Sequence, residues 1–123
     1  MAKSPNQKLK LLYLQQLLLQ KTDDEHRLTA DELIEVLARY GIEAERKSIY
    51  SDIEALQQYG LDVELQRGRG GGYYVASRAF ELPELKLLVD AIQCSRFITE
   101  KKSNELIKKL ESLASEPQAR TLQ

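Results

Sequence analysis

The stretch RKSIYSDIEALQQYGLDVELQRGRGGGYYV, residues 46–75, changes its hydrophobic period halfway along and decides the fold. Its first half repeats apolar residues at helical spacing, at Ile49, Ile53 and Leu56. Its second half alternates apolar with polar residues in the manner of a half-buried strand, at Leu61, Val63 and Leu65. The residues YYVA that follow the glycines are β-branched and aromatic, which favours a second strand. The stretch therefore predicts a helix followed by a β-hairpin.

The glycine-rich segment within it, QRGRGGGYYV (residues 66–75), has two explanations. A phosphate-binding loop needs a Lys-Ser or Lys-Thr pair leading into a helix, and a dinucleotide fingerprint needs glycine where Tyr73 stands. A hairpin tip explains the glycines better, because positive φ angles cost little only for glycine. Arg67 and Arg69 then project from the tip, with no acid between Arg67 and Arg78. A plain hairpin with incidental arginines is the alternative.

Two more helices are predicted upstream. Ser4 as N-cap and Pro5 in the first turn mark the start of the first helix. Its apolar stripe consists of Leu11, Leu14 and Leu18. Thr29 and Glu32 form a capping-box signature before the second helix. The stripe of the second helix consists of Leu33, Leu37 and Tyr40. Gly41 ends this helix, so that only a tight turn separates it from the third, which is typical of a helix-turn-helix.

Helical periodicity returns downstream at Pro83, which lies in or near the first turn of a fourth helix. The stripe of this helix consists of Leu85, Leu88 and Ile92. Thr99 caps a fifth helix. The stripe of the fifth helix consists of Leu106, Leu110 and Leu113. The final residues, SEPQARTLQ, look like a frayed tail.

These elements predict an α+β, mainly α protein with two parts. Residues 1–79 form a winged helix-turn-helix of three helices and a β-hairpin wing. Residues 80–116 form a C-terminal helical hairpin that acts as a linker or dimerisation element, and residues 117–123 form a tail. A homodimer through the C-terminal helices would present two copies of the third helix to two DNA half-sites. Packing of these helices within one chain is the alternative.

The composition is typical of a soluble globular protein, with 30% charged residues and a net charge of −1. No apolar run is long enough to cross a bilayer, and the N-terminus lacks a secretory signal. The single cysteine, Cys94, fits a reducing cytosol, so we expect a cytoplasmic protein without a membrane partner. The near-neutral net charge argues mildly against a protein that binds nucleic acid over most of its surface, but it is compatible with a local basic surface.

The third predicted helix, from about residue 46 to residue 58, has two different faces. The face opposite the apolar stripe carries Lys47, Tyr50, Ser51 and Glu54. These side chains can hydrogen-bond to base edges or phosphates in a major groove, and Glu54 can accept from a cytosine amine. Arg46 lies at the flank, where it is better placed for a phosphate than for a base. An ordinary solvated helix face is the alternative for this helix taken alone.

Three segments together resemble a known family: SIYSDIEAL in the third helix, GGYYV after the hairpin tip and ELPELKLLVDAI in the fourth helix. The chain resembles the N-terminal part of the WYL-domain transcriptional regulators of bacteria, over roughly residues 8–115. The resemblance implies a winged helix-turn-helix that binds DNA through the third helix and the wing. The contact residues that it implies are Lys47, Ser48, Tyr50 and Ser51, helped by Arg67 and Arg69.

The chain departs from the family pattern in three respects. Many relatives carry arginine where Ser51 stands, which bears on base preference and affinity. Many begin the third helix with serine or threonine where Glu45 stands, although an acid also suits a helix N-terminus. The family's C-terminal effector-sensing domain is absent from this sequence, which is expected to be either a fragment of a longer regulator or a natural short version.

The sequence therefore favours a sequence-specific DNA-binding transcriptional regulator whose partner is double-stranded DNA. The third helix would enter the major groove, and wing residues 67–72 would contact the flanking backbone or minor groove. A winged-helix protein-interaction module without DNA binding is the alternative, motivated by the net charge and by Asp52 and Glu54.

An enzyme is not supported by the sequence. The single histidine, His26, is interpreted as a solvated loop residue, and Cys94 as a buried, inert side chain within a helix. We expect no catalytic residues, no cofactor and no metal site, because the ligands for a closed site are missing.

Overall fold

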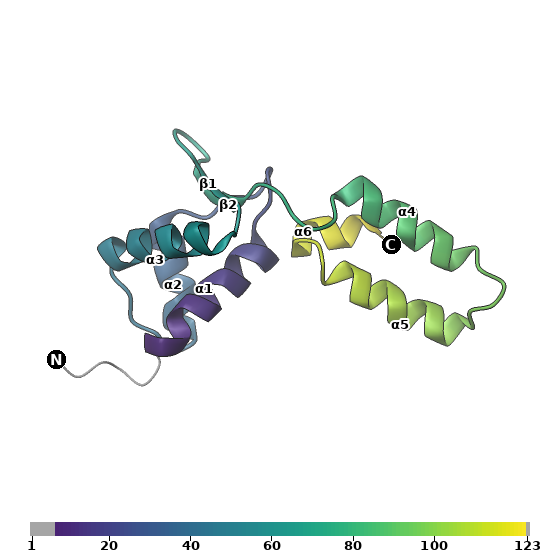
Figure 1. The fold of residues 1–123 in the computed structure, drawn as a ribbon. Coiled ribbons are helices and arrows are strands. Elements are labelled where there is room, and N and C mark those ends of the chain that lie inside the picture. Colours follow the sequence, from purple (N-terminus) through teal and green to yellow (C-terminus); the bar gives the residue numbers. More distant parts are fainter. Residues whose placement is uncertain (1–6, 123) are drawn as a thin grey trace. The chain divides into compact units, whose positions relative to one another are not determined.

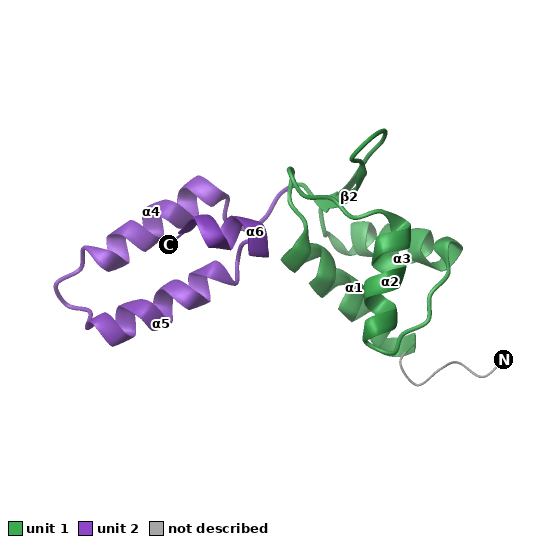
Figure 2. Cartoon of the chain, turned by 180° about the vertical axis from the view of Figure 1, so that it is seen from behind, with its two compact units in different colours: residues 1–76 green, residues 77–123 purple. Residues whose placement is uncertain are grey.

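The computed structural model describes residues 7–122, and the chain divides into two compact units, Met1–Ala76 and Ser77–Gln123 (Figures 1 and 2). The described part is mainly helical and contains one two-stranded antiparallel sheet, in agreement with the predicted fold class. The division falls slightly before the boundary expected after residue 79. The expected cap and proline of the first helix, Ser4 and Pro5, lie outside the described residues.

The first unit packs three helices around one core and adds a β-hairpin. Its elements are α1 (Gln7–Lys21), α2 (Ala30–Arg39), α3 (Arg46–Tyr59), β1 (Val63–Gln66) and β2 (Gly72–Val75). The predicted stripes supply much of the buried core, namely Leu14, Leu18, Leu33, Leu37, Ile49, Ile53 and Leu56. The capping box predicted for α2 is confirmed: the Thr29 N–H donates to Glu32 Oε1 at 2.9 Å, and the Glu32 N–H donates to Thr29 Oγ1 at 3.2 Å.

The hairpin buries its apolar side chains at its base, where Val63 pairs with Val75. Leu65 was expected to face the core but is 46% exposed, because the hairpin extends beyond the helices (Figure 1). A short backbone bridge ties β2 to the segment before α2. The Leu28 N–H donates to the Tyr73 carbonyl at 3.0 Å, and the Tyr73 N–H donates to the Leu28 carbonyl at 2.7 Å. The hairpin is therefore anchored at β2 while its tip is free of the core.

The second unit is a helical hairpin closed by a short C-terminal segment. Its elements are α4 (Leu82–Gln93), α5 (Glu100–Glu111), α6 (Glu116–Ala119) and a 3₁₀ turn (Arg120–Leu122). A separate small core joins them, formed by Leu85, Val89, Ile107, Ala114 and Leu122. Pro83 lies in the first turn of α4, and the Thr99 hydroxyl accepts from the Lys102 N–H at the start of α5, as predicted. No helix within residues 7–122 is long and apolar enough to cross a membrane.

Four expectations for the second unit are wrong. In α4, Val89 is buried and Leu88 of the predicted stripe is 37% exposed. The C-terminal residues form α6 and the 3₁₀ turn instead of a frayed tail, because Leu122 is buried in the small core. Cys94 is exposed, since it caps α4 on the side of the helix opposite Leu85. The stripe of α5 is shifted: Ile107 is buried, whereas Leu113 lies beyond the helix end and is exposed.

Candidate nucleic-acid interface

The start of α3 is held by a hydroxyl that the sequence had assigned to DNA. Ser48 Oγ donates to the Glu45 carbonyl at 2.9 Å and accepts from the Glu45 N–H at 3.2 Å. It also accepts from Lys10 Nζ of α1 at 2.8 Å. A serine hydroxyl offers one donor and two acceptor positions, so these three bonds use its whole capacity. Ser48 therefore serves the first turn of α3 and does not present a free hydroxyl to a ligand.

Lys10 is a structural residue that the sequence analysis overlooked. Its side chain is buried, with Nζ 2.6 Å from Asp52 Oδ2 and within hydrogen-bonding distance of Ser48. A buried lysine needs such an acceptor, because an unpaired buried charge is strongly unfavourable. The signal in the sequence was its position on the apolar side of the first helix, in line with Leu14 and Leu17. The contact fixes α1 to α3 and neutralises Asp52.

The outward face of α3 is arranged as predicted. Lys47, Tyr50, Ser51 and Glu54 are all exposed, whereas the opposite stripe is buried. The two acidic residues of α3 have different surroundings: Asp52 is paired with Lys10 of α1, and Glu54 lies on the exposed face. The exposed face consequently offers one cation, one phenol, one hydroxyl and one acid.

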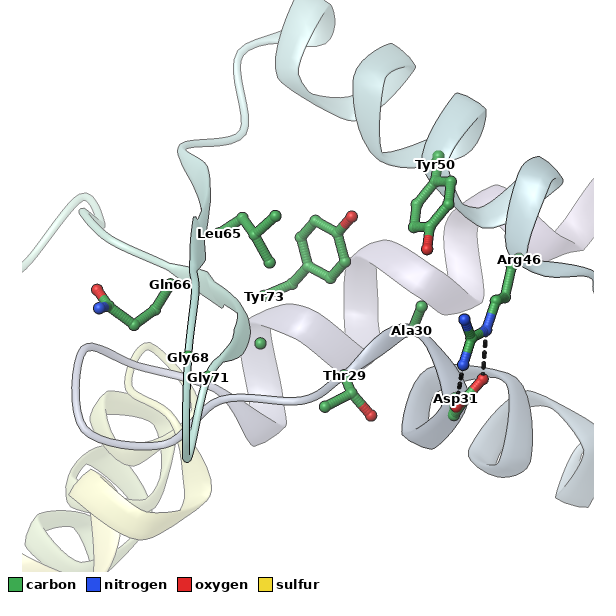
Figure 3. A pocket seen from close by; sticks show the side chains of 11 residues that line it. Thr29, Ala30, Asp31, Arg46, Tyr50, Leu65, Gln66, Gly68, Gly71 and Tyr73 are labelled. Carbon is green, nitrogen blue, oxygen red and sulfur yellow. Dashed lines mark hydrogen bonds and ion pairs between the residues drawn. The ribbon is translucent and has the colours of Figure 1, made fainter.

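Arg46 forms a two-point ion pair with Asp31 in the first turn of α2 (Figure 3). Arg46 Nε lies 2.8 Å from Asp31 Oδ1, and a second bond joins the other guanidinium nitrogen to Oδ2. The hydrogen bonds from Arg46 hold the pKa of Asp31 below its ordinary value, and the same bonds raise the pKa of Arg46. Both groups are largely exposed, so a phosphate near Arg46 would compete with Asp31 for it.

The tip of the hairpin carries Arg67 and Arg69, both exposed. The chain reverses there through a turn in which the Gly71 N–H donates to the Gly68 carbonyl at 3.0 Å. Gly72 at the start of β2 has a φ of +147°, and an added Cβ would lie 2.6 Å from the Leu28 carbonyl carbon. The glycines therefore let the hairpin pass close to the chain before α2, with two cations on the reversing segment.

A cleft of about 290 Å³ separates the hairpin from α3 and the start of α2 (Figure 3). Tyr50 of α3 and Tyr73 of β2 both extend into it, with Leu65 on the hairpin side and the Arg46–Asp31 pair on the side of α3 and α2. Partial burial, and secondarily the neighbouring Tyr50, raise the pKa of Tyr73, while Arg67 acts in the opposite direction. The Tyr73 phenol is therefore kept neutral and able to donate a hydrogen bond.

The cleft gathers only some of the predicted site residues. Arg46 and Tyr50 line it, whereas Lys47, Ser51 and Arg69 are exposed elsewhere on α3 and the hairpin. Tyr73 and Leu65 were not among the predicted site residues, because their place in the cleft follows from the hairpin register and from the approach of the hairpin to α3.

Tyr74, the neighbour of Tyr73, has its own partners. Its hydroxyl donates to Glu64 Oε2 at 3.0 Å, and the Arg27 guanidinium lies 5.2 Å from the centre of its ring. These contacts are consistent with the expectation that consecutive strand residues face opposite ways. Tyr73 is thus the tyrosine of this pair that belongs to the cleft.

The remaining reactive side chains do not converge on the cleft. His26 Nδ1 lies 2.7 Å from Asp23 Oδ1 in the loop after α1, and Cys94 belongs to the second unit. Within residues 7–122 no group of three or more potential metal-ligating side chains comes together. No protein-family model, no curated protein and no solved structure matches the chain.

Proposed function

We propose that the chain is a sequence-specific DNA-binding transcriptional regulator with a winged helix-turn-helix, acting in the bacterial cytoplasm as its resemblance to the WYL-domain regulators suggests. The helix α3 enters the major groove, and the β1–β2 hairpin is the wing. The observation that carries the proposal is the exposed polar face of α3 beside a hairpin with two exposed arginines. A major groove admits one α-helix, whose polar side chains reach base edges while flanking cations meet phosphates.

The charges near α3 favour DNA over a protein partner. Asp52, which motivated the protein-interaction alternative, is paired with Lys10, so Glu54 is the acid left on the exposed face. Lys47, Arg67 and Arg69 have no ion pair among the described residues and are available to phosphates. Ser48 is left out of the proposed contact set, because its hydroxyl is already committed.

Selection of binding sites from random duplex DNA by the purified chain tests this function. We expect enrichment of a defined sequence and binding that weakens as salt rises. Lys47→Ala and Arg69→Ala are expected to lower the affinity and to reduce the slope of log K against log salt by about 0.9 for each phosphate that is no longer neutralised. Lys101→Ala, an exposed lysine of α5 in the second unit, is the matched control and leaves the affinity unchanged. Absence of any enriched sequence, together with capture of a protein partner by the same surface, would support the protein-interaction module instead.

We also propose that two copies pair through the second unit. Leu87 on α4 is 70% exposed and Phe97 in the following loop is 99% exposed. A dimer through the second unit would cover these apolar side chains, and a two-fold dimer would match a palindromic site with half-sites one helical turn apart. The selected sequence reports on this directly, since a dimer enriches an inverted repeat and a monomer enriches a single half-site.

A further inference from the structure

The two phenols of the cleft have hydroxyls that the fold does not use. Tyr50 Oη and Tyr73 Oη make no hydrogen bond within residues 7–122, in contrast to Tyr74, whose hydroxyl is bonded to Glu64. Both rings point into the same cleft from facing elements (Figure 3). Two unused donors that converge in one concave site are an arrangement suited to a shared acceptor.

The position of the cleft indicates which part of a DNA duplex it would meet. The cleft lies between α3 and the hairpin, at the edge of the outward face of α3 where Tyr50 stands, and Lys47 and Ser51 of that face do not line it. A helix seated in the major groove has base edges in front of it and a sugar–phosphate strand along each side. The cleft consequently faces a backbone strand, and tyrosine hydroxyls are among the groups that bind phosphate oxygens in such interfaces.

We propose that this cleft holds one phosphodiester of the bound strand, with Tyr50 and Tyr73 donating hydrogen bonds to its non-bridging oxygens. The proposal rests on the DNA-binding function proposed above. The deoxyribose packs against Leu65 and Ala30, which supply the apolar part of the lining. The positive charge of Arg67 acts on the Tyr73 phenol and so adds positive potential at the proposed phosphate position.

Hydroxyl contacts and cation contacts leave different signatures in salt. A neutral phenol releases no counterion when it binds a phosphate, so its loss weakens binding without changing the salt slope. We expect Tyr50→Phe and Tyr73→Phe each to lower the affinity for the selected duplex by about 3- to 10-fold at every salt concentration. Because both hydroxyls serve one phosphate, the double variant loses less than the product of the two single losses.

Tyr59→Phe is the matched control, since Tyr59 lies on the same helix, is exposed and does not line the cleft. It leaves the affinity unchanged. Thermal unfolding of each variant checks that the fold is kept when the hydroxyl is removed and the ring remains. Tyr50→Phe keeps the test valid even if Tyr73→Phe is unstable, because Tyr50 is exposed.

Replacement of single phosphates in the duplex by neutral methylphosphonate locates the contact. We expect one backbone position at which the replacement weakens binding of the wild-type chain but has a smaller effect on Tyr73→Phe. If the wild-type chain binds the duplex and both phenylalanine variants bind it as tightly as wild type does, the phosphate site is wrong and the DNA-binding function stands. If every replacement affects wild type and Tyr73→Phe alike, the phosphate site is also wrong. If the wild-type chain binds no duplex, both proposals fail.

Discussion

Ser48 shows how a single hydroxyl can be committed to structure at a position where a functional role was expected. Ser48→Ala removes three hydrogen bonds at the start of α3 and leaves the buried Lys10 with one fewer acceptor. We expect the free energy of unfolding to fall by about 1–2 kcal/mol, as for the loss of a helix cap. Urea denaturation measures it. The control is Ser51→Ala on the exposed face, which changes stability by less than about 0.5 kcal/mol. Equal stability of Ser48→Ala and wild type, with weaker DNA binding, would restore the role in DNA contact.

Asp31 makes the stability of the first unit depend on pH in the acid range. Its pKa is lowered in the folded chain by the hydrogen bonds from Arg46, so its stabilising effect is complete above the ordinary value of 3.8 and is lost as the pH falls through the lower folded-state pKa. We expect the melting temperature of wild type to exceed that of Asp31→Asn at neutral pH, and the difference to disappear in acid below that ordinary value. The difference is small and shrinks with added salt, because the pair is exposed. A constant difference at all pH values would contradict this explanation.

At the scale of elements, the sequence predicted helices well wherever a cap and an apolar stripe agreed. Thr29 and Thr99 each precede an apolar stripe, and both cap the expected helix. The segment α6 is too short to show a period, and only the burial of Leu122 in the small core explains why it is ordered. The Lys10 contact and the pairing of Tyr50 with Tyr73 across a cleft depend on how elements approach in space, which periodicity does not encode.

The contact of the hairpin with the segment before α2 depends on Gly72, and two substitutions separate its role from that of Gly70. Gly72→Ala places a Cβ against the Leu28 backbone at a φ of +147°, so that the bridge between Leu28 and Tyr73 must open. We expect a loss of about 1–3 kcal/mol in the free energy of unfolding. Gly70→Ala is the matched control, since Gly70 has a φ of +72° and open space around it, and it costs about 1–2 kcal/mol at most.

Thermal unfolding and DNA affinity measured together complete that comparison. Gly72→Ala disturbs the cleft through Tyr73 and weakens DNA binding, whereas Gly70→Ala leaves the bridge between Leu28 and Tyr73 in place and weakens binding less. If the two variants proved equally stable and bound DNA with equal affinity, the hairpin would be more flexible than its contacts with Leu28 indicate.

At the scale of the whole molecule, the chain contains two units with separate cores, one built from α1, α2 and α3 with the hairpin base and one from α4 and α5 with the C-terminal turn. Such a division lets DNA binding and self-association reside in different units. Substitutions in one core are therefore expected to leave the stability of the other core unchanged, because the two cores share no residues.

A pair of matched leucines tests where two copies meet. Leu87 of α4 and Leu12 of α1 are both exposed, at 70% and 60%, so replacing either by glutamate costs little in folding. If the second unit carries the dimer, Leu87→Glu sediments as a monomer at concentrations where wild type and Leu12→Glu are dimers. Leu87→Glu then binds a single half-site as tightly as wild type but loses affinity for the inverted repeat, because the α3 helices of two copies are no longer held together in a dimer. A wild-type chain that stays monomeric at high concentration removes the dimer, and a monomeric Leu12→Glu with a dimeric Leu87→Glu moves the interface to α1.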